Sequence, residues 1–199
     1  MVYWDLPHGP EIPSVSGDLE GAMAEAVRHL LELGPRRILF LGHEAEFPVQ
    51  NPRLLGYLSA INATGVPVDP HLIQGIPRWE DSLAAGYHRV MQVLRRGLPF
   101  TAVAAANDLL AIGAIRALRE RGLSVPEDVS VTGIDDIELS SYVEPPLTTV
   151  HLPKRDIGRL LVTGLIEQIE KPESGGVRIA VRLGKRMGIR GSTGVIRNV

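Results

Sequence analysis

The sequence predicts an α/β protein with a doubly wound parallel sheet, and two observations support this class. First, several apolar runs of strand length are continuous rather than alternating, as in "RRILFLG" (36–42) and "FTAVAAA" (100–106). Second, segments with apolar residues at helical spacing stand between these runs. Strands that are apolar at every position are typical of a parallel sheet that helices cover on both faces.

The ends of the predicted elements carry recognisable signals. The first helix opens near Ser16–Asp18 and ends at Gly34, and the third helix ends at Gly97. Pro48 and Pro52 break the loop before the second helix. The predicted helices are residues 16–34, 53–65, 79–97, 107–122 and 153–171. The predicted strands are residues 1–5, 36–42, 71–75, 100–106 and 128–135, followed by extended segments at 146–152, 177–183 and 186–190.

Composition narrows the class of protein. The 199 residues include 44% hydrophobic and 22% charged side chains and carry a formal net charge of −2. The chain therefore lacks the basic surface that binds nucleic acid through phosphate neutralisation alone. It has no cysteine, no apolar run of about 20 residues and no signal-peptide pattern at its start. We expect a soluble, cytoplasmic protein that binds no membrane.

Two polar pairs follow predicted strands at the point where each strand ends. Asn107 and Asp108 follow one strand, and Asp135 and Asp136 end another. In open sheets of this kind, ligands bind outside the carboxyl ends of the strands. Both pairs are therefore expected at the same ligand-binding edge. Asp108 is expected to serve as a helix cap or structural partner, and Asn107 is assigned to a ligand.

Four side chains are candidates for ligand binding. Asn107 can donate and accept hydrogen bonds, and Asp135 can accept from vicinal hydroxyls, which suits a polyhydroxylated molecule. Arg53 begins a helix after a loop, although a solvated charge in a first turn is the simpler interpretation. Trp79 begins the third helix, where it either packs as an ordinary aromatic residue or forms a platform for a sugar face.

The sequence gives little support for catalysis, a cofactor or a metal. It contains no G-x-S-x-G elbow, no phosphate-binding loop and no G-x-G-x-x-G turn after a strand. The six histidines show no ligand spacing. Asp135 and Asp136 are adjacent at a strand end and so point in different directions, which makes a shared proton unfavourable. We expect a protein that is not an enzyme and that holds no cofactor or metal.

Several stretches, in order, resemble the effector-binding core of the lactose and galactose repressor (LacI/GalR) family of transcription regulators. The resemblance is carried by "GAMAEAVRHLLELGPRRILFLG", "RLLGY", "FTAVAAANDLLAIGAIRALRERGLSVPEDVSVTGIDD", "PPLTTV" and "RGSTG". It implies a periplasmic-binding-protein-like fold in which Arg53, Asn107 and Asp135 contact the effector. Trp79 would be the stacking aromatic, although it lies two residues too far from the following Gly-Tyr. Leu152 stands where relatives often have a polar residue.

The resemblance also implies a division of the chain. Residues 1–16 would be a remnant of the N-terminal subdomain, 17–150 the C-terminal effector-binding subdomain, 151–185 a crossover segment and helix of the N-terminal subdomain, and 186–199 a return to the C-terminal one. The chain would thus be mainly the C-terminal subdomain of a two-lobed core. Operator DNA would be bound only through a helix-turn-helix headpiece that this sequence lacks.

The apolar face of the helix at 154–171 suggests a homodimer. That face comprises Ile157, Leu160, Leu161, Leu165 and Ile169.

Three functional classes follow from these features. The leading hypothesis is an effector-sensing and dimerising domain of a LacI-type regulator, with a sugar, a sugar phosphate or a nucleoside as effector. The second is a sugar-binding component of a transport system with the same fold. The third is an enzyme of doubly wound fold, which the missing catalytic motifs disfavour.

Overall fold

The computed structural model describes residues 3–4, 14–34, 37–44, 51–170 and 182–195. The chain divides into two compact units. One unit consists of residues 1–19 and 152–186, and the other of residues 20–151 and 187–199. Each unit has its own sheet, so each is described separately below.

The larger unit is built on a six-stranded sheet with the strand order β4-β3-β5-β6-β7-β9. The pairs from β4 through β7 are all parallel. Every residue of β5, and all but the last of β3 and of β6, is buried, as the continuous apolar runs predict. The strands are β3 (Ile38–His43), β4 (Ile73–Ile76), β5 (Ala102–Ala105), β6 (Ser130–Asp135), β7 (Thr148–His151) and β9 (Arg186–Gly188).

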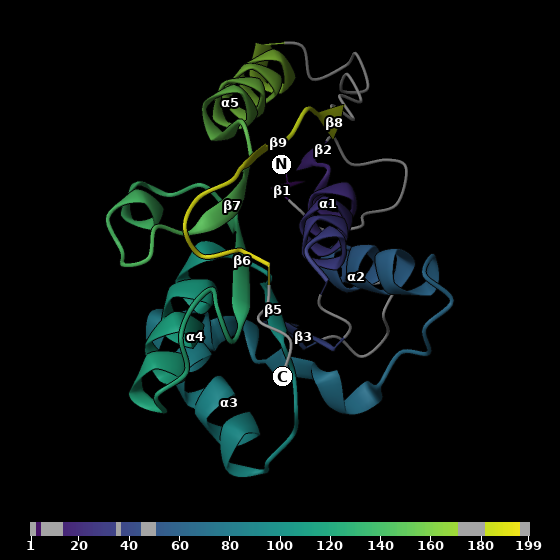
Figure 1. Ribbon diagram of the computed structural model, residues 1–199. Coiled ribbons are helices and arrows are strands. Elements are labelled where there is room, and N and C mark those ends of the chain that lie inside the picture. Colours follow the sequence, from purple (N-terminus) through teal and green to yellow (C-terminus); the bar gives the residue numbers. More distant parts are fainter. Residues whose placement is uncertain (1–2, 5–13, 35–36, 45–50, 171–181, 196–199) are drawn as a thin grey trace. The chain divides into compact units, whose positions relative to one another are not determined.

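Helices cover both faces of this sheet. Figure 1 shows α1 and α2 on one side and α3 and α4 on the other, so the predicted doubly wound class is confirmed. On the first side, Tyr57 of α2 donates a hydrogen bond to the carbonyl of Ile38 and stacks obliquely against Phe40, 5.4 Å between ring centroids. The helices are α1 (Leu19–Glu32), α2 (Pro52–Asn62), α3 (Leu83–Arg95) and α4 (Asp108–Glu120), with short 3-10 turns at Pro70–Leu72, Arg78–Glu80 and Glu138–Ser141.

Glycines let α3 and α4 approach closely on the second side. A Cβ atom on Gly113 would lie 2.1 Å from the carbonyl oxygen of Leu83. One on Gly86 would lie 2.4 Å from the carbonyl oxygen of Leu110. Both obstacles are backbone atoms, which cannot rotate away, so the two helices keep this spacing only with glycine at these positions. Tight packing here fixes the start of α4, where a ligand-binding residue is predicted.

The smaller unit contains a three-stranded sheet, β1-β2-β8, and the helix α5 (Lys154–Glu170). The strands are β1 (Tyr3–Trp4), β2 (Ser14–Gly17) and β8 (Arg182–Leu183). Lys185 reaches the carboxylate of Asp18 at 2.7 Å, which ties the two ends of this unit together. In α5 Ile157 is buried, whereas Leu165 and Ile169 are exposed.

The sequence placed most elements correctly and missed a few boundaries. Trp79 was predicted to begin the third helix, but α3 begins at Leu83 because the side chain of Ser82 accepts a hydrogen bond from the backbone N–H of Ala85. The strand β2 was not predicted. The predicted segments at 1–5 and 177–183 are described only at 3–4 and 182–183. None of the helices in the described part of the chain has the length and apolar character needed to cross a membrane.

Candidate functional site

The strand order locates a topological switch point in the larger sheet. From β3 the chain moves outward to β4, and it then crosses back to β5 on the other side of β3. Connections that diverge in this way leave a crevice at the carboxyl ends of the two neighbouring strands, where ligands bind. Here those ends are His43 of β3 and Asn107, which follows β5.

Asn107 has both parts of its amide engaged. Its Oδ1 accepts a hydrogen bond from the backbone N–H of Leu110 at 2.9 Å, so Asn107 is the N-cap of α4. Its Nδ2 donates to Oδ1 of Asp81 at 2.6 Å. The prediction that Asp108 is the cap is therefore wrong, because the residue with extended backbone just before the helix is Asn107. Its role as a ligand contact stays a prediction.

Asp81 contacts two polar side chains at this edge, Asn107 and His43. Its Oδ2 lies 3.2 Å from Nε2 of His43, close enough for an ion pair although not aligned as a hydrogen bond. The contact with His43 lowers the pKa of Asp81, and the hydrogen bond from Asn107 and the charge of Arg53 lower it further. The predicted residue Asn107 and the strand-end residue His43 are thus brought together through Asp81, a carboxylate that the sequence did not point to.

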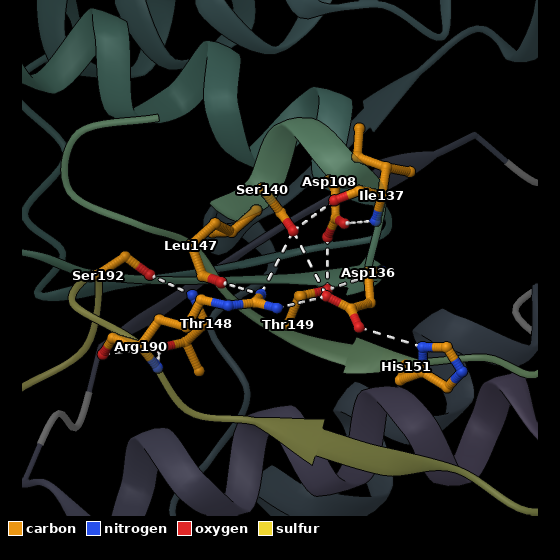
Figure 2. A network of polar contacts seen from close by, with 10 residues as sticks. All are labelled: Asp108, Asp136, Ile137, Ser140, Leu147, Thr148, Thr149, His151, Arg190 and Ser192. Carbon is orange, nitrogen blue, oxygen red and sulfur yellow. Dashed lines mark hydrogen bonds and ion pairs between the residues drawn. The ribbon is translucent and has the colours of Figure 1, made fainter. Parts of the chain in front are cut away.

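Asp108 is instead a buried structural partner, which was the other role predicted for it. Its Oδ1 accepts from the hydroxyl of Thr149 in β7, at 2.5 Å, and its Oδ2 accepts from the backbone N–H of Ile137, at 2.8 Å (Figure 2). A Cβ atom on Gly133 would lie 2.3 Å from this carboxylate, so glycine in β6 makes room for it. Burial raises the pKa of Asp108 to about 7, although both hydrogen bonds act in the opposite direction.

The turn after β6 has an unusual backbone. Asp135 has φ 113° and Asp136 has φ 52°, values in the left-handed region that non-glycine residues rarely adopt. The N–H of Asp136 donates to the hydroxyl of Thr149, and the next N–H is the one that Asp108 accepts. The buried Asp108–Thr149 pair therefore holds the backbone that presents Asp135.

The side chain of Asp136 faces a different set of partners. Figure 2 shows its carboxylate between Arg190, at 2.7 Å from Nη2, and His151, at 3.1 Å from Nδ1. Burial alone would raise the pKa of Asp136, but Arg190 and His151 outweigh it and lower the pKa. Arg190 comes from the C-terminal segment, where Ser192 also donates to the carbonyl of Val131 in β6. Asp136 is thus a structural residue, held between Arg190 and His151.

The two remaining predicted residues lie at the same edge but in different settings. Asp135 is half-buried, and its charge contributes to the raised pKa of Asp108. Trp79 lies in the 3-10 turn after β4 and is 85% exposed. An indole that is this exposed does not pack at a helix start, so the simpler interpretation of Trp79 is wrong. Leu152, where relatives often have a polar residue, is buried.

Two signals identify the residues that the sequence analysis missed. His43 is the last residue of β3, and Asp81 immediately precedes the N-cap of α3. His43 thus lies at a strand end, as Asn107 does, whereas Asp81 lies in the connection from β4 to α3. The sequence predicts a helix that begins at Trp79, so Asp81 was expected inside that helix and not in the connection before α3.

Comparison with known proteins identifies the family of this fold. Residues 27–193 match the periplasmic binding protein-like domain family. The HTH-type transcriptional repressor CytR of Escherichia coli is 37% identical over 184 residues, which are 92% of this chain and 52% of CytR. The chain thus spans about half the length of the curated relatives it matches.

Solved structures share the fold at similar identity. A LacI-family protein from Sanguibacter keddieii has a TM-score of 0.87 at 37% identity, covering 97% of this chain and 73% of that one. A LacI family transcriptional regulator from Enterococcus faecium with bound ribose has a TM-score of 0.85 at 30% identity, covering 98% and 71%. These relatives are transcriptional regulators. By these matches and its periplasmic-binding-protein-like fold, the chain belongs to the LacI family of transcriptional regulators.

Proposed function

We propose that this chain senses a polyhydroxylated small molecule and thereby controls DNA binding by the protein to which it belongs. The effector would bind at the carboxyl edge of the larger sheet, to Arg53, Asn107 and Asp135, with Trp79 as a stacking platform. The observation that carries this proposal is the contact of Asp81 with both Asn107 and His43 at the switch point. Hydrogen-bond donors and acceptors meet at this edge of the sheet, which is where proteins of this fold class bind ligands.

The chemistry of these side chains suits hydroxyl groups. The Asp135 carboxylate can accept from two vicinal hydroxyls, and the Arg53 guanidinium can donate to hydroxyl or ring oxygens. The exposed indole of Trp79 offers an apolar face to the C–H side of a sugar ring. The ribose bound by the relative from Enterococcus faecium supports a sugar or nucleoside as effector.

Control of DNA binding would follow from linkage. An effector that binds one conformation more tightly shifts the population toward it, and the affinity for operator DNA changes by the same coupling free energy. The operator would be bound by a helix-turn-helix headpiece outside this sequence, as the HTH-type designation of CytR suggests. In this proposal the protein is cytoplasmic and has no catalytic activity or cofactor. Because the relatives are transcriptional regulators, the transport alternative is not favoured.

The division of the chain into subdomains and its assembly as a homodimer are part of the same proposal. Four large apolar side chains of α5 are exposed, namely Val162, Leu165, Ile166 and Ile169. A contiguous apolar helix face of this kind usually meets a partner, and a second copy of the chain is the simplest one. Light scattering of the full-length protein should give the mass of a dimer. A monomer with a protected, well-ordered α5 would contradict it.

A ligand screen with a DNA-binding readout tests the proposed function. The full-length protein would be heated with ribose, other neutral sugars and nucleosides, each at millimolar concentration. At about 100 times its dissociation constant, a true effector stabilises the folded state by about 2.7 kcal/mol, a clear rise in Tm. The same ligand should change the affinity for an operator fragment by about 5- to 150-fold in a fluorescence anisotropy titration.

Two controls make the screen decisive. Arg53→Ala should remove most of the Tm shift while leaving the Tm of the ligand-free protein nearly unchanged. A ligand that stabilises the protein without changing operator affinity would contradict a regulatory role. A complete absence of stabilising sugars or nucleosides would contradict the proposed class of effector.

A further inference from the structure

The strand β4 has one open side. It is the last strand at one edge of the six-stranded sheet, and its neighbour among the described strands is β3. The N–H of Glu44 donates to the carbonyl of Ile76, so the backbone groups of Ile76 face β3, as do those of Gln74 two positions earlier. The backbone groups of Ile73 and Gly75 therefore face away from the sheet.

Three of these outward groups are left without a strand to pair with. The N–H of Ile73 donates to the carbonyl of Pro70, which leaves the carbonyl of Ile73 and both the N–H and the carbonyl of Gly75. No strand in the described residues lies beside them. Unpaired groups along a strand edge are a template on which another extended chain can form hydrogen bonds.

A first hollow lies between this edge and the beginning of α3. Its volume is about 280 Å³, and its lining includes Ile76 of β4 and His88 and Arg89 of α3. It also reaches Ser82, the N-cap of α3, where the N–H groups of the first turn favour a negative charge. Glu80 is the acidic residue of the lining, and Arg89 offsets its charge. The helix start and His88 then favour a carboxylate in this hollow.

A second hollow lies between β4 and the end of α3. Its volume is about 310 Å³. Val93, Leu98 and Pro99 give it an apolar lining, and Gln74 of β4 and Arg96 are among its polar residues. This hollow therefore suits an apolar side chain. The two hollows and the open side of β4 are together called the edge groove below.

We propose that the edge groove binds an extended acidic segment of a partner protein. The segment adds a strand to the open side of β4, with an acidic side chain in the first hollow and an apolar side chain in the second. Alternate side chains of a strand point to the same face. Ile76 and Gln74, which line the first and the second hollow, are two residues apart, so side chains two positions apart in the added strand reach successive hollows.

The charges around the edge groove favour an acidic segment over a basic one. Arg89 and Arg96 line it, and neither makes an ion pair with another described residue. Against these two positive charges stands the one negative charge of Glu80, so the three side chains sum to +1. Main-chain hydrogen bonds would give the affinity, and the two hollows would select the side chains. This proposal does not depend on the proposed function.

Three short peptides test the proposal on the full-length protein. The probe is fluorescein-labelled TETLTET, which places glutamate and leucine on one face and threonine on the other. Threonine is used because Glu44 lies next to Gly75 on the face of β4 opposite α3. Fluorescence anisotropy should give a dissociation constant of about 10–500 μM. TKTLTKT reverses the charge, and PEPLPEP keeps it but opposes strand pairing; each should bind at least about tenfold more weakly.

Paired arginine variants test the charge of the edge groove. Arg89→Gln combined with Arg96→Gln should weaken binding of TETLTET by about five- to tenfold, since each exposed charge pair contributes little by itself. Arg121→Gln combined with Arg155→Gln makes the same change in net charge at two exposed positions outside the edge groove. That control should bind TETLTET within about twofold of wild type.

Two substitutions of Gly75 test the added strand. Gly75→Pro removes the outward N–H and leaves the pairs with β3, because proline is tolerated where an edge residue faces away from the sheet. It should weaken binding of TETLTET by about tenfold. Gly75→Ala places a Cβ at the same point, beside the flexible side chain of Glu44, but keeps the N–H. It should bind within about twofold of wild type. Circular dichroism and the Tm of each variant check that it is folded.

Each remaining outcome would overturn the proposal. No binding of TETLTET, or equal binding of TKTLTKT, would rule out an acidic segment as the ligand. Equal binding of PEPLPEP, or wild-type affinity in Gly75→Pro, would rule out strand addition. Equal losses in the two paired arginine variants would place the peptide outside the edge groove. If Gly75→Pro does not fold, PEPLPEP and the paired arginine variants decide the question.

Discussion

Asp135→Asn should weaken effector binding by about 100-fold and leave the fold nearly unchanged. In the proposed site this carboxylate accepts hydrogen bonds from two neighbouring hydroxyls. Hydrogen bonds to a charged group contribute about 1.5–3 kcal/mol each, so loss of the charge and of one acceptor site corresponds to about 2.7 kcal/mol, or 100-fold. Titration calorimetry with the effector found in the ligand screen measures the change, and the operator response should disappear with it.

The backbone at Asp135 decides which substitution gives a clean answer. With φ 113° this residue is in a conformation that asparagine tolerates better than most residues do. Asp135→Ala would add backbone strain of about 1–3 kcal/mol to the lost contact, so weak binding could then reflect a displaced turn. Asp135→Asn should therefore have a free energy of unfolding within about 0.5 kcal/mol of wild type. Wild-type effector affinity in that variant would show that Asp135 is not a ligand contact.

The sequence was sufficient to predict the larger sheet and to place Asn107 and Asp135 at one edge of it. Continuous apolar runs identified β3, β5 and β6, and all three are buried along nearly their whole length. Parallel strands then place their following residues at one edge, which is how Asn107 and Asp135 could be chosen together. The strands could be predicted because a strand that is buried on both faces has apolar residues at successive positions.

The details of the site depend on contacts between residues far apart in the chain. Asparagine and aspartate are about equally good helix caps, so local preference could not decide between Asn107 and Asp108. The outcome depends on Thr149 and on Gly133, which give Asp108 a partner and a space. Asp81 was missed because a 3-10 turn and an extended residue replace the predicted start of a helix.

The buried carboxyl of Asp108 should make the stability of the protein depend on pH above the usual range for aspartate. Burial raises its pKa from 3.8 to about 7 in the folded state. Between these values the folded protein keeps a proton that the unfolded chain has lost, so the free energy of unfolding falls as pH rises from about 4 to about 7. At about 1.4 kcal/mol per pKa unit, the full effect is on the order of 4 kcal/mol.

Other groups titrate in or near this range, so a variant must isolate Asp108. The pKa of His29 is lowered by burial, which reduces stability as pH falls below about 6.5 and opposes the effect of Asp108. The lowered pKa values of Asp81 and Asp136 matter only below about pH 4, where their ion pairs are lost. Asp108→Asn removes one titrating group and leaves these others in place.

Urea unfolding of wild type and Asp108→Asn at pH 5, 6, 7 and 8 gives the measurement. At pH 5 the variant should be less stable by about 1–2 kcal/mol, because its amide NH2 would face one of the two groups that donate to Asp108, the Thr149 hydroxyl or the Ile137 N–H. By pH 8 the gap should close or reverse, since wild type must then hold a buried charge. The exposed Asp156→Asn, on α5, should follow wild type at every pH. Parallel curves for wild type and Asp108→Asn would contradict a raised pKa.

The ionisation of Asp108 should also change the affinity of the proposed effector site. Asp108 accepts the N–H of Ile137, and its partner Thr149 accepts the N–H of Asp136, so both hold the turn that presents Asp135. Ionisation of Asp108 above pH 7 adds a third negative charge beside that turn, next to Asp135 and Asp136, without changing its hydrogen-bond partners. Effector affinity in wild type should therefore depend on pH between 6 and 8, and Asp108→Asn should remove most of that dependence. An equal pH dependence in both proteins would place the titrating group elsewhere.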